Sequence, residues 1–299
     1  MGNATDTTAL TIALAQYAQL PIGTPFDSFA QSVRSIAESH ATSGARPQLI
    51  VFPEMHLFGT PGVDARESER LQLEAATDLH DGLIRSLGDL SRELGVWLIP
   101  GTLPEKADRG GIHNTAVVFS PEGKLVASYR KICPWRPYES YIPGTSFTVV
   151  DIPGKGRIGL TICYDAWFPE ISRQVAWLGA DMIVNTVRTT TRDRLQETVL
   201  ARSNAIVNQV YMASVNAAEP DGMGDSLLVD PEGHVLSHLD GPKQQLLITT
   251  VNLGHARRVR SEGTEGCNKL WEEFRDDDPP VPLPLYGGSI DSTLWAPRR

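Results

Sequence analysis

Leu160-Thr-Ile-Cys163-Tyr164-Asp165-Ala-Trp167-Phe-Pro169-Glu170 joins an apolar run, a cysteine and a helix start within a dozen residues. The run begins at Ile158 and reads as a buried strand, while Pro169 and Glu170 are typical of the first turn of a helix. This pattern predicts that the Cys163 thiol leaves the end of a strand and faces the N-terminus of the next helix. Free amide N–H groups and the helix dipole at such a place favour a thiolate.

The first hundred residues alternate between strand and helix patterns. Short apolar runs are separated by segments in which apolar residues recur every three or four positions. Such alternation is typical of parallel crossover units. The predicted strands are 10–19, 48–52 and 96–99; the intervening helices carry Phe29, Val33, Ile36 and Ala37, and then Leu79, Leu83, Leu87, Leu90 and Leu94.

Two similar turns predict two hairpins. Ser120-Pro-Glu-Gly123 and Asp230-Pro-Glu-Gly233 each separate a pair of apolar segments, with proline and glycine at favoured turn positions. Matched hairpins in corresponding halves of the chain indicate two similar sheets. Further strands are expected at 182–185, 211–216 and 245–253, and a helix that carries Leu195, Val199, Ile206 and Val210 lies between the first two. The predicted fold class is α/β, a four-layer α-β-β-α sandwich of two mixed β-sheets with helices outside.

Composition limits the class of protein. The chain has 299 residues, 41% of them hydrophobic, and a net charge of −9, which argues against nucleic-acid and membrane partners. Three cysteines, no apolar run long enough to span a membrane and a polar segment 1–8 favour a cytoplasmic protein. We expect one domain at 1–275 and an extended C-terminal arm at 276–299, where prolines exclude a helix or a central strand.

Three predicted strands deliver reactive side chains at their ends. Glu54 follows one strand, Lys131 a second and Cys163 a third. Strand ends at one edge of a sandwich converge, so a carboxylate, an ammonium and a thiol are expected to meet. Together they suit acyl transfer.

The chain resembles the nitrilase (carbon–nitrogen hydrolase) superfamily, in its amidase and carbamoylase-like branch, from about Ala13 to Leu253. The segments that carry the resemblance are Phe52-Pro-Glu54, His113-Asn-Thr-Ala116, Tyr129-Arg-Lys131, Cys163-Tyr-Asp165 with Phe168-Pro-Glu170, and the two Pro-Glu-Gly hairpins. The four-layer sandwich is also the fold that this resemblance implies.

The resemblance implies a role for each matching residue. Cys163 matches the nucleophile, Glu54 the general base and Lys131 the amine that stabilises the oxyanion, together with the backbone N–H of Tyr164. Glu139 matches a second glutamate, which is expected to orient Lys131 and the substrate.

Substrate-binding candidates are Tyr164, Arg188, Trp167 and Tyr138. Arg188 follows a predicted strand on the active-site side and has a guanidinium fork that suits a carboxylate or carbonyl group; pairing with an acidic residue of the following helix is the alternative. The aromatic residues can line a pocket or simply pack in the protein. Gly154-Lys-Gly156-Arg-Ile-Gly159 precedes a strand instead of following one, and no His/Cys set has zinc spacing, so neither a cofactor nor a metal is expected.

The sequence therefore predicts a cysteine-dependent amidohydrolase that cleaves a linear amide or carbamoyl C–N bond through a thioester and releases ammonia or an amine. Two alternatives stay open. A nitrilase would make an acid from a nitrile, although the Trp-Glu that usually follows the cysteine of nitrilases is missing. A catalytically silent binding or scaffold protein is the other. The resemblance also implies a homodimer or larger homo-oligomer, assembled through the helix at 169–179.

Overall fold

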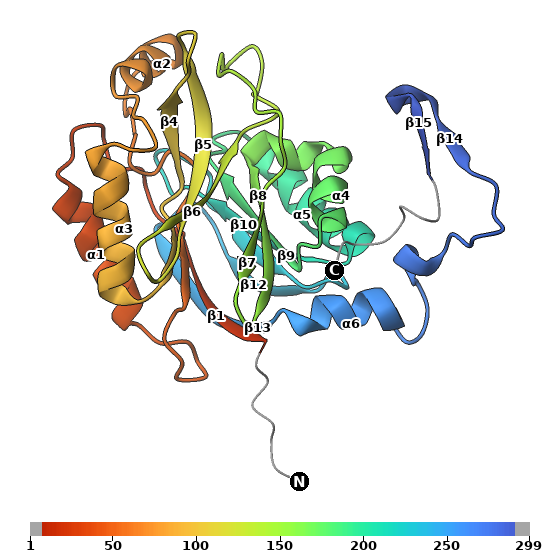
Figure 1. Ribbon diagram of the computed structural model, residues 1–299. Helices are drawn as coiled ribbons and strands as arrows, with labels where there is room; N and C mark the ends of the chain where they lie inside the picture. Colours follow the sequence, from red (N-terminus) through yellow and green to blue (C-terminus); the bar gives the residue numbers. More distant parts are fainter. Residues whose placement is uncertain (1–7, 291–299) are drawn as a thin grey trace.

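The computed structural model describes residues 8–290 and contains two β-sheets packed face to face (Figure 1). The first sheet has the order β13 (Gln245–Asn252), β1 (Ala9–Gln16), β2 (Leu49–Val51), β3 (Trp97–Ile99), β5 (Ile112–Phe119) and β4 (Thr102–Lys106), with β6 (Leu125–Arg130) paired to β5. The second has the order β12 (Val235–Leu239), β11 (Ser226–Val229), β10 (Tyr211–Asn216), β9 (Met182–Val187), β8 (Gly156–Ile162) and β7 (Val149–Ile152).

Both sheets are mixed and follow the same plan. Three consecutive strands are parallel in each, β1-β2-β3 in the first and β8-β9-β10 in the second, and antiparallel strands flank them. The two predicted hairpins are β5-β6 and β11-β12, one in each sheet. The prediction of two similar sheets is confirmed.

Helices cover the outer faces of both sheets (Figure 1). Those on the first sheet are α1 (Phe26–Glu38) and α3 (Gly82–Leu94); those on the second are α4 (Pro169–Trp177) and α5 (Arg194–Asn208). Two further helices, α2 (Ala65–Glu74) and α6 (Gly254–Glu262), lie at the periphery. The four-layer α-β-β-α sandwich is therefore confirmed.

Three buried clusters fill the three spaces between the layers. Strand β1 shows how, because its side chains alternate between two faces. Ile12 and Leu14 point into the central cluster between the sheets, where Leu160 of β8 also lies. Ala13 and Ala15 point the other way, into the cluster beneath α1 and α3. The third cluster lies between the second sheet and α4 and α5.

Some local predictions differ from the structure. The leucine-rich helix begins only at Gly82, so Leu79 precedes it, and neither α2 nor α6 was predicted. Asp64 starts α2 by accepting a hydrogen bond from the backbone N–H of Glu67. Two strands of the two large sheets were also missed: β4 contains Pro104, which weakens a strand pattern, and β7 has only four residues.

Helix α5 is confirmed, but most of its large apolar residues do not face the core, which α5 contacts through Ala201 and Ala205. Leu195, Val199 and Ile206 are 68%, 65% and 46% exposed, whereas Glu197 and Ala201 are buried. The apolar spacing correctly predicts a helix and wrongly suggests which of its faces packs against the sheet.

The C-terminal segment leaves the body of the protein. Strands β14 (Val281–Leu283) and β15 (Gly288–Ile290) form a small hairpin that projects beside α4 (Figure 1), and the Tyr286 hydroxyl donates to the carboxylate of Glu170. Residues 1–7 and 291–299, which include most of the polar N-terminal segment and the end of the expected arm, lie outside the described residues. The boundary at 275 stays a prediction.

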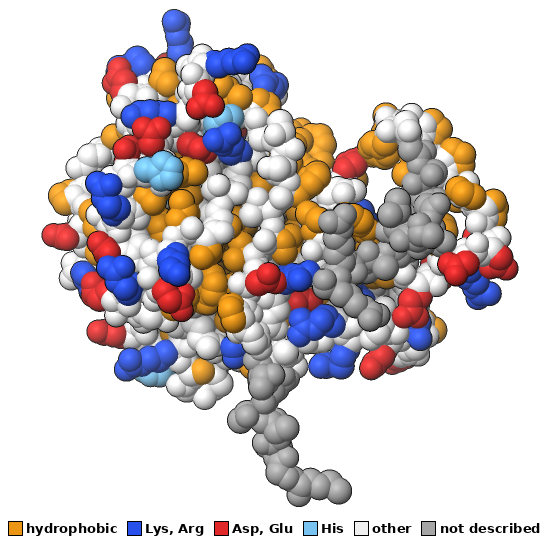
Figure 2. All heavy atoms as spheres, in the orientation of Figure 1, with side chains coloured by type: hydrophobic (Ala, Val, Ile, Leu, Met, Phe, Trp, Pro, Cys, Tyr) orange, Lys and Arg blue, Asp and Glu red, His pale blue; other side chains and the backbone are white. Residues whose placement is uncertain are grey.

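Acidic and basic side chains are interspersed on the face drawn in Figure 2, without a large basic patch on that face. Within residues 8–290, the helices are all too short or too polar to cross a membrane.

Candidate active site

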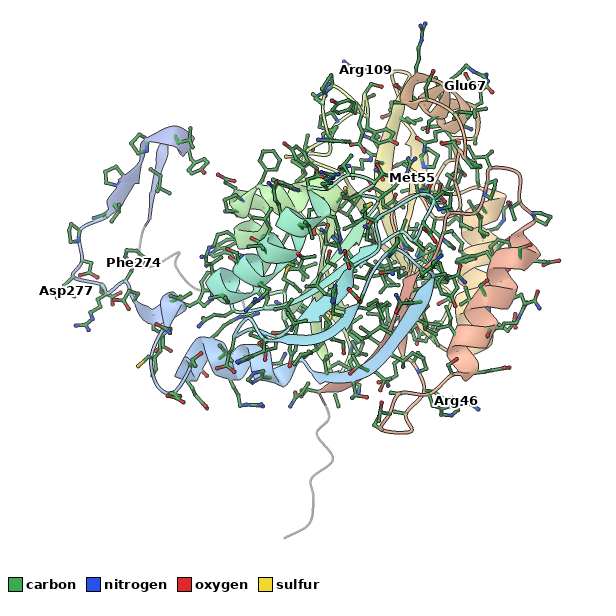
Figure 3. All side chains as sticks on the ribbon, turned by 180° about the vertical axis from the view of Figure 1, so that it is seen from behind. Arg46, Met55, Glu67, Arg109, Phe274 and Asp277 are labelled. Carbon is green, nitrogen blue, oxygen red and sulfur yellow. The ribbon has the colours of Figure 1, made fainter. Side chains whose placement is uncertain are left out.

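Glu54, Lys131 and Cys163 follow the ends of three strands, as predicted. Glu54 comes after β2, Lys131 directly after β6 and Cys163 directly after β8. Arg46 precedes β2 and Met55 follows Glu54, and Figure 3 places these two labelled residues at opposite ends of the sheets. The site therefore lies at the Met55 end, where strands of both sheets terminate.

Lys131 lies at the centre of a buried ionic cluster. Its Nζ is 3.1 Å from Glu54 Oε1 and 2.7 Å from Glu139 Oε2. The side chain of Lys131 is fully buried and that of Glu54 is 3% exposed. Asn114 Nδ2 donates to Glu54 Oε1 at 2.7 Å, and the backbone N–H of Trp135 donates to Glu139 Oε2 at 2.7 Å. Each carboxylate is thus oriented by a second donor besides the ammonium.

Cys163 occupies a strained turn. Its φ is 47°, a left-handed conformation that is rare for residues other than glycine, and a short 3₁₀ helix (Cys163–Trp167) begins there. Asp165 stabilises this turn because its Oδ2 accepts from the backbone N–H of Ile162 at 3.0 Å. The same carboxylate accepts from the Tyr129 hydroxyl at 2.8 Å and from the backbone N–H of Cys133 at 2.8 Å, so it joins strand ends from both sheets.

Burial controls the protonation of the cluster. Burial, followed by the charge of Glu54, raises the pKa of the Cys163 thiol well above its usual value, and Lys131 only partly opposes this. Burial also raises the pKa of Glu54, against the charge of Lys131. Burial acts to lower the pKa of Lys131, but the neighbouring acidic groups, Glu54 foremost, outweigh it and raise that pKa. Burial thus favours the neutral thiol and opposes the effect of the helix N-terminus, so Cys163 needs a base to become a thiolate.

A cavity of about 240 Å³ adjoins the ionic cluster through Glu139. Tyr138 and Arg188, two of the predicted substrate-binding residues, line it. Tyr138 is 60% exposed and packs against Trp135 with ring centroids 4.5 Å apart. Arg188 Nε is buried and has no hydrogen-bond partner among the described residues. The other lining residues are Val63, Ala65, Ser68, Glu69, Gln72, Trp135, Glu139, Ser140, Tyr141 and Thr190.

Tyr164 and Trp167, the other two candidates, lie outside the wall of this cavity. The Tyr164 ring packs against Trp167 and Phe168, at centroid distances of 5.9 and 5.3 Å. Trp167 Nε1 donates to Glu197 Oε1 at 3.4 Å.

Several residues of the site were missed in the sequence. Asn114 stands in the segment His113-Asn-Thr-Ala116 but had no assigned role, although its contact with Glu54 is one of the closest in the site. Thr189 Oγ1 lies 3.8 Å from Cys163 Sγ and donates to the buried carboxylate of Glu197 at 2.9 Å. The family-like segment could have pointed to Asn114, whereas Thr189 is brought to the cysteine by the fold.

In the part of the chain that the structure describes, one group of side chains away from this site has metal-ligand chemistry. Asp230, Glu232 and His255 offer ligand atoms within 4.8 Å of one another. These groups already pair with histidines, since His255 Nε2 lies 3.3 Å from Glu232 and His234 Nδ1 lies 3.0 Å from Asp230. We therefore assign no metal site there.

Comparisons with known proteins agree with this geometry. The carbon–nitrogen hydrolase family profile matches residues 11–261. A formamidase of Nitratidesulfovibrio vulgaris is 31% identical over 270 residues, which cover 89% of this chain and 76% of that protein. A formamidase of Bacillus cereus is 31% identical over 219 residues, which cover 71% of this chain and 63% of that protein, so the chain spans less than two thirds of this relative's length.

Solved structures share the fold. Nit3 of Saccharomyces cerevisiae, a member of branch 10 of the nitrilase superfamily, has a TM-score of 0.72 and 26% identity, with 85% of this chain and 94% of that chain covered. A cysteine-to-alanine mutant of the Nesterenkonia amidase has a TM-score of 0.69 and 24% identity, with 87% and 98% covered. With the profile match over most of its length and a strand-end cluster of glutamate, lysine and cysteine, the chain belongs to the carbon–nitrogen hydrolase family.

Proposed function

We propose that this protein is a cysteine-dependent amidohydrolase that cleaves a linear amide C–N bond through a thioester acyl-enzyme. The observation that carries the proposal is the position of the Cys163 thiol, on a strained turn beside the buried Glu54–Lys131–Glu139 cluster. The two formamidase relatives support amides over nitriles.

In the first half-reaction, Glu54 takes the proton of Cys163 as Sγ attacks the carbonyl carbon. A raised pKa suits Glu54 to this task, since it makes the carboxylate a stronger base. Negative charge then develops on the carbonyl oxygen, where Lys131 and the backbone N–H of Tyr164 stabilise it. The C–N bond breaks, and the nitrogen leaves with the proton that Glu54 returns.

In the second half-reaction, a water molecule gives a proton to Glu54 and attacks the thioester carbon. The C–S bond breaks, the carboxylic acid leaves and the proton returns to the Cys163 sulfur. Glu139 takes no proton in this scheme; it holds Lys131 in place through its two contacts of 2.7 and 3.0 Å.

The cavity beside Glu139 holds the acyl part of the substrate in this proposal. Its volume of about 240 Å³ suits a small molecule, and Arg188 offers a buried N–H that has no partner within residues 8–290. We propose that Arg188 and Tyr138 contact the substrate, whereas Trp167 and Tyr164 shape the surroundings of the cysteine.

The oligomer and the cytoplasmic location are further proposals. Leu195, Val199 and Ile206 form an exposed apolar row on α5, next to α4, and such a row suits an interface with a second copy. Sedimentation of the wild type and of a Leu195→Glu/Val199→Glu variant tests this. Loss of a dimer in the variant supports the interface, and an unchanged sedimentation coefficient contradicts it.

Ammonia release from a panel of formamide, acetamide, propionamide, N-carbamoyl glycine and propionitrile tests the function. We expect the wild type to release ammonia from at least one amide or carbamoyl substrate, and the Cys163→Ala variant to release none while it keeps the wild-type circular dichroism spectrum. Turnover of propionitrile alone, or substantial turnover by Cys163→Ala, would contradict the proposal.

A further inference from the structure

A buried chain of polar groups reaches Cys163 through Thr189. Cys163 Sγ lies 3.8 Å from Thr189 Oγ1, which donates to Glu197 Oε1 at 2.9 Å. Glu197 Oε2 in turn lies 3.1 Å from Arg194 Nη1. Thr189 and Glu197 are each 6% exposed and Arg194 is 1% exposed. The proposed mechanism uses none of these three residues.

Neighbouring hydrogen-bond donors and acceptors fix this series of polar side chains in place. The backbone N–H of Thr189 donates to Asn216 Oδ1 at 2.9 Å, and Asn216 Nδ2 donates to the carbonyl of Thr189 at 3.2 Å. Arg194 also donates to Ser214 and to the carbonyls of Gly224 and Asp225. Glu197 stands three residues after Arg194 on α5, so both side chains project from the same inward face. The Thr189 hydroxyl is thus fixed in place beside the thiol.

The direction of the hydrogen bonds decides what Thr189 can bind. The carboxylate of Glu197 contacts donors on both of its oxygens: Oε1 accepts from the Thr189 hydroxyl and the Trp167 indole N–H, and Oε2 accepts from Arg194. The single hydroxyl proton of Thr189 is committed to Glu197. Oγ1 therefore presents lone pairs to the reacting centre, where it can accept an N–H but cannot stabilise an oxygen that carries negative charge.

The position of Thr189 brings it within reach of the substrate's amide group. A carbonyl carbon about to be attacked lies roughly 3–3.5 Å from the nucleophile. An atom bonded to that carbon can then lie within hydrogen-bond distance of a group 3.8 Å from the same sulfur. Because Lys131 supplies the positive charge for the oxygen, the nitrogen is the atom that suits Thr189.

We propose that Thr189 Oγ1 accepts a hydrogen bond from the amide nitrogen of the substrate, and that Glu197 is a positioning residue that keeps Oγ1 an acceptor. This rests on the proposed function and deepens it. The site then prefers acyl donors whose leaving group has an N–H, primary carboxamides above all, over esters or thioesters of the same acid.

The test compares two substrates, an amide and a thioester, that give the same acyl-enzyme. The best amide of the ammonia-release panel is paired with the S-methyl thioester of the same acid, so that hydrolysis of the acyl-enzyme is common to both. The quantity measured is the ratio of kcat/KM for the amide to kcat/KM for the thioester. Thr189→Val keeps the shape of the side chain and removes the acceptor, and we expect it to lower this ratio about three- to ten-fold.

Three further variants separate substrate binding from a structural role. Thr189→Ser retains the hydroxyl and should restore the wild-type ratio. Glu197→Gln can donate to Oγ1 and free the hydroxyl proton, so it should lower the ratio as Thr189→Val does. Thr198→Val removes a hydroxyl that donates to the carbonyl of Leu195 within the same helix, and it should leave the ratio unchanged.

An equal loss of both activities in Thr189→Val, with or without a loss of folded protein, overturns the inference, because Thr189 then supports the site without contacting the amide. Failure of Thr189→Ser to restore the ratio also overturns it. These results leave the proposed function intact. Absence of amide turnover in the wild type removes the function and this inference together.

Discussion

Lys131 Nζ and Glu54 Oε1 lie 3.1 Å apart, with almost no exposure of either side chain to water. Removing two charges from water carries a large desolvation cost, which this contact only partly offsets. Glu139 and the amide of Asn114 add further contacts to this pair. Buried ion pairs of this kind, in which most hydrogen-bonding groups have partners, occur more often at functional sites than as a source of stability.

Glu54→Gln keeps the size of the side chain and its contact with Asn114 but removes the proton acceptor. We expect kcat to fall about 10²- to 10⁴-fold, the usual contribution of a general base. Steady-state ammonia release measures this, and Glu93→Gln, which changes a half-exposed surface glutamate, is the matched control. A Glu54→Gln enzyme within a few-fold of the wild type would show that the base lies elsewhere.

Glu139→Gln weakens one of the two charged contacts of Lys131. A hydrogen bond between charged groups contributes about 1.5–3 kcal/mol, so we expect kcat to fall roughly 10- to 100-fold, less than in Glu54→Gln. The acceptor for the Trp135 backbone N–H is retained, which limits damage to the loop. If both glutamate variants are equally inactive, Glu139 takes part in proton transfer and its assignment as an orienting residue is wrong.

Arg188→Ala tests the cavity. Succinamate and butyramide have similar lengths, but only succinamate carries a carboxylate. If Arg188 binds that group, its loss should raise KM for succinamate about 10- to 100-fold and hardly change KM for butyramide. The exposed neighbour Arg192 provides the control variant, Arg192→Ala. Equal increases for both substrates would mean that Arg188 only shapes the cavity.

His56 gives the fold a sensitivity to acid. It is buried, stacks on Phe52 at a centroid distance of 4.6 Å, and burial lowers its pKa to about 3. Between pH 6.5 and 3 the unfolded chain binds a proton at this histidine, whereas the folded chain does not. The contribution of neutral His56 to the free energy of unfolding is therefore complete above pH 6.5 and is lost as the pH falls. At pH 5 the loss amounts to about 2 kcal/mol.

Urea unfolding of the wild type and His56→Phe at pH 7 and pH 5 measures this term. Between pH 7 and pH 5, the free energy of unfolding should fall by about 2 kcal/mol less in the variant than in the wild type, whatever the stability of the variant at pH 7. The same pH dependence in both proteins would exclude His56 as the cause.

The sequence predicts what depends on local pattern. Alternation in β1 and the Pro-Glu-Gly turns identify strands and hairpins because side-chain period and turn chemistry are local properties. The reactive residues at strand ends are predictable for the same reason. The structure brings Glu54, Lys131 and Glu139 into direct contact and places their charges around Cys163. Their catalytic roles stay predictions.

Other features depend on packing that no local pattern records. Helix α5 carries Leu195 and Val199 at helical spacing, so the apolar pattern favours the wrong face. The inward face has Arg194 and Glu197 instead, a buried ion pair that is tolerated because each of its ends finds partners on other elements. The pKa of the Cys163 thiol also cannot be predicted from a local pattern, since it depends on how deeply the thiol is buried.

The central claim is that Cys163 becomes acylated during turnover. Rapid acid quench of the enzyme with its best amide, followed by intact-mass and peptide mass spectrometry, measures this directly. We predict an added mass equal to the acyl group minus one hydrogen, located on the peptide that contains Cys163 and absent from the Cys163→Ala variant. Ammonia release by the wild type with no adduct on Cys163 under any quench time, and with the same rate in Cys163→Ala, would contradict the account.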